Sequence, residues 1–148
     1  MALGDIIEIR EKLDHAYAEE IVKKMALHEH PELHALVERM EKLAADGDLG
    51  KATLDADREF HKIIAKKANN LFLLQLVEAF WDVEEVVFPK LGLNDVENAK
   101  SNAQMHRRLL AAAERGDLPQ YQKLTVEHYM PLKNRLPRPN YFPDENTH

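Results

Sequence analysis

Apolar residues recur every three or four positions along nearly the whole chain, and a period near 3.6 residues is typical of amphipathic α-helices. Glycine is scarce, with 5 among 148 residues, and no segment alternates β-branched with polar residues as a strand would. The prolines lie at apparent segment boundaries or near the carboxyl end. The sequence therefore predicts an all-α fold.

Start and stop signals divide the chain into six predicted helices. Pro31 suits a first helical turn, Asn69-Asn70 can end one helix and cap the next, and Gly116-Asp117 can do the same. Pro131 should kink or end the last helix, because its ring removes a donor and clashes with the preceding turn. The predicted helices cover about 5–27, 31–46, 51–68, 71–87, 95–115 and 118–131, and residues 137–148 read as an extended tail.

Composition narrows the classes of protein to which the chain can belong. Its length fits one domain, and the absence of cysteine leaves His, Asp and Glu as metal ligands. No apolar run approaches the roughly 20 residues that span a bilayer, and no secretion signal is visible, so we expect a soluble cytoplasmic protein without membrane contact. A net charge of −6 argues against direct nucleic-acid binding.

The stretch from Asp55 to Asn70 places two possible metal ligands on the buried face of the third predicted helix. Asp57 and His61 are four residues apart, so their side chains lie one turn above the other among apolar neighbours. A carboxylate buried without a partner costs several kcal/mol, so Asp57 needs a cation or strong hydrogen-bond donors. A metal ion shared with His61 would satisfy that need.

Two later histidines, His106 and His128, also fall on the apolar stripes of their helices. A lone histidine in that setting is more often a hydrogen-bonded core residue than a ligand. Here, however, three imidazoles and one carboxylate from three helices all lack an obvious local partner, and helical bundles build metal sites from inward side chains. The sequence therefore predicts one divalent ion, Zn, Ni, Mn, Co or Fe(II), bound by Asp57, His61, His106 and His128.

Arg10 interrupts the apolar stripe of the first predicted helix. It either extends its charged group towards solvent and pairs with Asp14 four residues on, or it faces inward as the receptor for an anion. Asn102, one turn before His106, is a candidate for the same pocket on geometry alone. These two residues are the candidate effector-binding side chains.

Two alternatives follow from other acidic and histidine residues. His34 and Glu38 have the four-residue spacing seen in di-iron bundles, which leaves a hemerythrin-like di-iron protein as one alternative. A metal-dependent hydrolase or isomerase is the other, because a bound ion can activate water. It needs a general base, and we expect Glu59 and Glu127 to point away from the site. The sequence thus favours a protein that is not an enzyme.

Four segments, taken together, resemble a known family. They are IIEIREKLDHAYAEEIVKKM at 6–25, DREFHKIIAKKANN at 57–70, HRRLLAAAERGD at 106–117 and EH at 127–128. Their order resembles the FCD domain, the C-terminal effector-binding and dimerisation domain of FadR-type regulators in the GntR family. The resemblance covers residues 6 to about 135.

The resemblance implies an antiparallel bundle of six to seven helices that dimerises around an internal metal and ligand pocket. Metal-binding members hold their ion with one Asp and three His, which match the four residues named above. Their effectors are mostly small carboxylates that reach the ion, and Arg10 matches an arginine of the family's first helix. The predicted helix at 71–87 is apolar on most sides, which also favours a homodimer.

These features predict a metal-dependent, carboxylate-sensing domain of a bacterial transcriptional regulator, formed by residues 1–136. Binding of the effector would rearrange the dimer and so control DNA binding. FadR-type regulators carry an N-terminal winged helix-turn-helix domain, and this sequence has no segment that matches one. We therefore expect DNA contact only through an N-terminal domain outside this chain.

Overall fold

A computed structural model describes residues 3–136 and 138–144 of the protein. Within these residues the chain forms seven α-helices and one short 3-10 helix, and no strand. This confirms the all-α fold. The helices are α1 (Leu3–Ala16), α2 (Ala18–Met25), α3 (Pro31–Ala45), α4 (Lys51–Lys66), α5 (Leu71–Val87), η1 (Phe88–Lys90), α6 (Val96–Arg115) and α7 (Leu118–Arg135).

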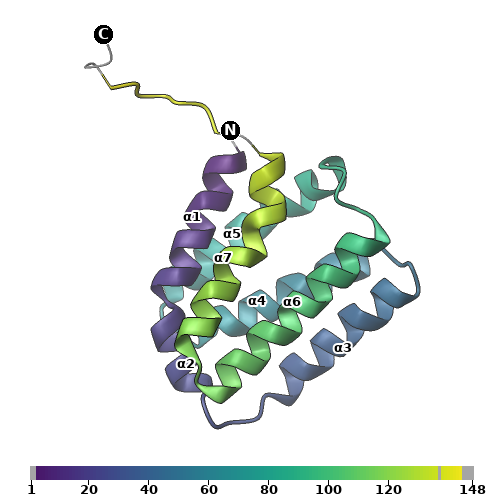
Figure 1. Ribbon diagram of the computed structural model, residues 1–148, viewed down its shortest axis with the longest axis vertical. Coiled ribbons are helices and arrows are strands. Elements are labelled where there is room, and N and C mark those ends of the chain that lie inside the picture. Colours follow the sequence, from purple (N-terminus) through teal and green to yellow (C-terminus); the bar gives the residue numbers. More distant parts are fainter. Residues whose placement is uncertain (1–2, 137, 145–148) are drawn as a thin grey trace.

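The helices pack in a closed circuit around a common interior (Figure 1). Helix α1 packs on α7, α7 on α6, α6 on α3, α3 on α4, α4 on α5, and α5 returns to α1. The short helix α2 packs against α6 and α7. Side chains from α1, α4, α5, α6 and α7 can therefore meet inside the bundle.

Side chains at the helix ends satisfy backbone groups that the helices leave unpaired. Asn69 has a left-handed φ of 52°, and the Asn70 side chain accepts a hydrogen bond from the Leu73 N–H at 3.0 Å. This is the tight reversal between α4 and α5 that the sequence predicts. Asp95 and Asp117 cap α6 and α7 in the same way.

The first helix departs from the prediction of one continuous segment from Asp5 to Leu27. The backbone leaves helical geometry at Tyr17, with φ −90° and ψ 0°, which separates α1 from α2. Leu27 lies beyond α2 with a φ of 63°. The break lets α1 pack on α5 and α7 while α2 packs on α6 and α7.

Pro131 does not end the last helix, contrary to one of the two outcomes predicted for it. Helix α7 continues through Pro131 to Arg135. The proline lies at an exposed position. The loss of a single backbone hydrogen bond is therefore tolerated within a helix that packs along α1 and α6.

Residues 138–144 lie outside the helices and contact the start of α1. Arg138 pairs with Asp5 at 2.7 Å and with Glu8 at 2.6 Å, and the Tyr141 hydroxyl donates to Asp5 at 3.0 Å. The remaining residues of the predicted tail, 137 and 145–148, lie outside the described residues. In the described part of the chain, no helix combines the length and apolar character needed to cross a bilayer.

The cap at the start of α5 gives a test of the fold. We expect Asn70→Ala to lower the free energy of unfolding by about 1 kcal/mol, because it leaves the Leu73 N–H without its acceptor. Urea denaturation followed by circular dichroism would measure the change. Asn70→Asp keeps the acceptor and should retain most of the stability. Equal losses in the two variants would show that the cap is not the cause.

Candidate metal centre

Three histidines from three helices converge inside the bundle. His61 of α4, His106 of α6 and His128 of α7 each present a ring nitrogen, and these nitrogens lie within 4.8 Å of one another. His106 is fully buried and His61 nearly so. Phe60 packs edge-on against His61 and His106, which fixes the plane of both rings. The structure thus brings together three of the four predicted metal ligands.

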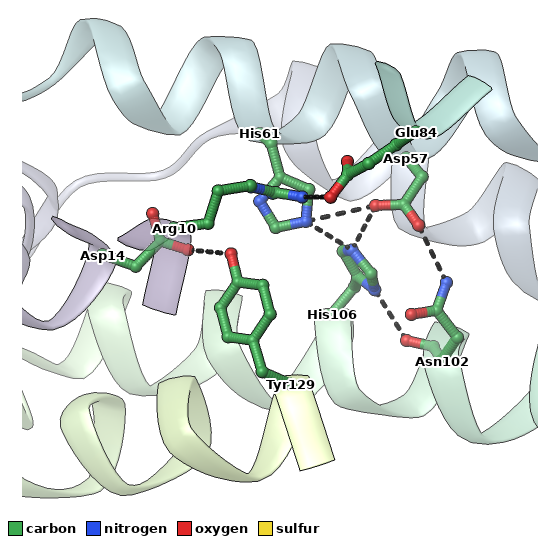
Figure 2. A network of polar contacts seen from close by, with 8 residues as sticks. All are labelled: Arg10, Asp14, Asp57, His61, Glu84, Asn102, His106 and Tyr129. Carbon is green, nitrogen blue, oxygen red and sulfur yellow. Dashed lines mark hydrogen bonds and ion pairs between the residues drawn. The ribbon is translucent and has the colours of Figure 1, made fainter. Parts of the chain in front are cut away.

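Asp57 completes the group on the side of His61 and His106 (Figure 2). Its Oδ1 atom lies 2.9 Å from Nε2 of His106 and 3.1 Å from Nε2 of His61. The two Nε2 atoms are themselves 3.1 Å apart. One carboxylate oxygen and two ring nitrogens therefore face a single point, and the Asp57 side chain is only 13% exposed.

Asn102 orients both Asp57 and His106 (Figure 2). Its backbone carbonyl lies 2.6 Å from Nδ1 of His106, and its side-chain amide donates to Oδ2 of Asp57 at 3.1 Å. A carbonyl can only accept, so Nδ1 of His106 carries a proton. In the neutral ring, Nε2 then has a lone pair directed at the Asp57 carboxylate. Two acceptors this close need a cation between them, either a proton or a metal ion.

Burial and mutual contacts shift the pKa values of the centre in different directions. Burial alone would raise the pKa of Asp57, but His106 and His61 outweigh it and hold that pKa well below its usual range. Burial lowers the pKa of His61 and, together with the positive charge of its neighbours, that of His128. His61 and His128 are therefore neutral near pH 7 and can offer lone pairs, as metal ligands must.

Arg10 faces the interior and pairs with Glu84 of α5, not with Asp14 (Figure 2). The Arg10 side chain is 4% exposed and Glu84 is 0% exposed. The guanidinium carbon of Arg10 lies 5.3 Å from the ring centres of both Trp81 and Tyr129. Of the two alternatives for Arg10, the outward one with a pair to Asp14 is therefore wrong, and the inward orientation is the one observed. Asp14 instead accepts a hydrogen bond from the Tyr129 hydroxyl.

A cavity of about 240 Å³ opens beside the centre. Arg10, Asn102 and three of the four predicted ligands line it, namely Asp57, His61 and His128. Glu127 also lines the cavity, but its side chain is 39% exposed. Its carboxylate lies 3.8 Å from Arg108 and 3.9 Å from Lys123. The other lining residues are Leu49, Thr53, Leu54, Trp81, Phe88, Pro89, Leu93, Asn94, Asp95, Asn98, Ala99, Ser101, Met105, Pro131 and Leu132.

Comparison with known proteins identifies the family. A family model described as the FCD domain matches residues 5–130, which is most of the chain. The chain belongs to the FCD family. A protein of Micromonospora viridifaciens named "Putative transcriptional regulatory protein NedR" is 35% identical over 107 residues, which make up 72% of this chain and 75% of that protein. The resemblance inferred from the four sequence segments is thereby confirmed.

Sequence reasoning missed two residues that complete the interior of this FCD domain, Glu84 and Tyr129. Glu84 lies one turn after Trp81 and two turns after Val77, both of which are buried on α5. That spacing places an acid on an inward face and could have indicated it. Tyr129 follows His128 directly, and its pairing with Asp14 joins positions 115 residues apart, which no local pattern records.

Glu84 has an unusual environment for a carboxylate. Burial raises its pKa to about 7, although the charge of Arg10 and a hydrogen bond from it act in the opposite direction. Among the described residues, its Oε2 atom and the Nε1 atom of Trp81 are buried without a hydrogen-bond partner. Trp81 also lines the cavity.

The histidines near the start of α3 form a different contact from the one that a di-iron protein requires. Nε2 of His34 lies 2.6 Å from a carboxylate oxygen of Glu114 in α6, and Nδ1 of His30 lies 3.4 Å from the other. Glu38 is exposed and takes no part in this contact. Within the described residues, the one group with metal-site spacing is the histidine cluster of α4, α6 and α7.

The raised pKa of Glu84 predicts a pH dependence of stability in EDTA-treated protein. The unfolded chain releases this proton near the ordinary pKa of 4.5, and the folded protein only near 7. Glu84 therefore contributes fully to the free energy of unfolding below pH 4.5. This contribution is lost as the pH rises to 7, a change on the order of 3 kcal/mol.

Glu84→Gln should remove this decline, because it keeps the shape of the side chain without a titrating group. Urea denaturation of the unaltered protein and of Glu84→Gln, at intervals from pH 4.5 to 8, would measure the free energy of unfolding of each. The difference between the two curves isolates Glu84 from the histidines, which titrate in both proteins. Parallel curves would show that Glu84 has an ordinary pKa in the folded protein.

Proposed function

We propose that this FCD domain is a metal-dependent sensor of a small carboxylate in a bacterial transcriptional regulator. The observation that carries the proposal is the convergence of three imidazoles and one carboxylate at the inner wall of a cavity. The name of the relative from Micromonospora viridifaciens, a transcriptional regulatory protein, supports the regulatory assignment.

The donor set fits a divalent ion. His61, His106 and His128 would supply nitrogen, Asp57 would supply oxygen, and this combination without thiolate suits Zn, Ni, Mn, Co or Fe(II). Asn102 orients the Asp57 carboxylate and fixes the tautomer of His106. Metal ligands commonly receive such support from neighbouring hydrogen bonds. An ion bound by these four residues would keep further coordination positions open for an oxygen of the effector.

Arg10 and Asn102 are the polar side chains placed to orient the effector. Both line the cavity beside the histidines. Arg10 has N–H groups in addition to the one that Glu84 engages, and guanidinium groups bind carboxylates well. A carboxylate effector would thus meet the guanidinium of Arg10 and the ligand cluster in the same cavity.

The proposed output is a shift in the packing of a homodimer that controls DNA binding through another domain. Helix α5 carries the exposed apolar side chains Leu71, Phe72 and Val86, which a second subunit would cover. Residues of α1, α4, α5, α6 and α7 all line the cavity or contact its polar centre. An effector that binds one arrangement of these helices better than another shifts the population towards it.

Zinc titration tests the metal part of the proposal. In isothermal titration calorimetry, metal-free protein should bind one Zn²⁺ per chain. His106→Ala and His128→Ala should each weaken binding by about 100-fold or more, because each removes a ligand. His34→Ala is the matched control, since His34 contacts Glu114 on another side of α6. Binding of two ions, or a loss as large in the control, would contradict the assignment.

A carboxylate panel tests the sensor part. At 100 times its dissociation constant, a small carboxylate effector should add about 2.7 kcal/mol to the unfolding free energy of the zinc-loaded protein. The same acid should add nothing to EDTA-treated protein or to His106→Ala, because both lack the complete centre. Thermal unfolding followed by fluorescence would measure the gain. A gain of equal size without zinc would show that binding is independent of metal.

A further inference from the structure

The cavity also indicates which carboxylates it accepts. Resting on the proposed function, we infer that the effector is a monocarboxylate with an apolar body, and that Glu84 excludes dicarboxylates by neutralising Arg10. The inference uses three features of the described residues: the pairing of Arg10, the charges around the cavity and the character of its walls.

The first step concerns the charge available to an anion. Arg10 is the one Arg or Lys among the described residues that line the cavity, and Glu84 holds it in a pair that is almost completely buried. A divalent ion, Asp57, Arg10 and Glu84 would together carry one net positive charge. One carboxylate cancels that charge. A second carboxylate would enter a site with no positive charge left to balance it.

The second step concerns the remaining charges of the cavity. Two further acids line it besides Asp57, namely Asp95 and Glu127. Asp95 caps α6 through the Asn98 N–H at 2.8 Å, and Glu127 faces Arg108 and Lys123 at distances that give weak attraction. Arg10 is already paired, and no other Arg or Lys of the described residues lines the cavity, so a second carboxylate would lack a cation there, which disfavours it wherever water is partly excluded.

The third step concerns the walls and the size of the cavity. Leu54, Phe88, Leu93, Met105 and Leu132 line it from α4, η1, the following loop, α6 and α7. An apolar cavity of about 150 Å³ holds benzene, so about 240 Å³ accommodates a body of that size together with a carboxylate. Such walls favour an alkyl or aryl body over one rich in hydroxyl groups.

Hexanoate and adipate form a matched pair of probes. They have the same six-carbon chain, and adipate carries a carboxylate where hexanoate has its methyl group. Calorimetric titration of protein loaded with one equivalent of Zn²⁺, at pH 8, should give hexanoate a dissociation constant at least about 10-fold lower. Zinc measured in the protein after each titration would verify that adipate has not removed the ion.

Two variants locate the source of this preference. Glu84→Gln frees the charge of Arg10 and should reduce the ratio of the two dissociation constants to about 3-fold or less. Glu85→Gln is its matched control, because Glu85 follows directly on α5 but pairs with Arg58 at the surface, and it should leave the ratio unchanged. Circular dichroism would establish that both variants are folded.

Leu93→Lys tests the same idea without altering the buried pair. Leu93 lines the cavity from the loop before α6, so a lysine there supplies a cation for a second carboxylate and should tighten adipate binding about 5-fold.

Adipate binding as tight as hexanoate binding in the unaltered protein would overturn the inference and leave carboxylate sensing intact. If zinc-loaded protein bound no carboxylate at all, the proposed function would fail instead.

Discussion

Charged groups buried in an apolar bundle are the constraint on which this structure depends. Removing one partner of a buried ion pair costs about 3–5 kcal/mol, a large part of the stability of a domain of this size. The chain meets the constraint with partners on other helices. Arg10 of α1 pairs with Glu84 of α5, and Asp57 of α4 pairs with His106 of α6. Each pair therefore fixes how one helix lies along another.

The same pairs link the cavity to the helices that surround it. Asp14 and Arg10 lie one turn apart on α1 and connect it to α7 and α5, respectively. The break at Tyr17 frees α1 from α2, so α1 can follow these contacts while α2 packs elsewhere. A ligand that altered the balance of charge at the centre would act on several helix pairs together, because Arg10, Asp57 and His61 line the same cavity.

Sequence reasoning located the residues that share a helical stripe and missed the pairs that join different helices. Asp57, His61, His106 and His128 can be predicted because each interrupts an apolar stripe, and the structure brings them together. The caps at Asn70 and Asp117 follow from local chemistry and were also predicted. The partner of Arg10 could not be predicted from local chemistry, since Glu84 lies 74 residues away. The break at Tyr17 depends on tertiary packing and has no local signal such as proline or glycine.

The Arg10–Glu84 pair is poorly explained by stability alone. Replacing a buried ion pair by apolar residues of similar volume is often neutral or stabilising, and burial here already raises the pKa of Glu84 to about 7. A chain under selection only to fold would do as well with two apolar side chains. The pair does, however, set the charge of a cavity that contains a single arginine among its described lining residues. Arg10 can thus donate hydrogen bonds to an anion while Glu84 limits how much negative charge that anion brings.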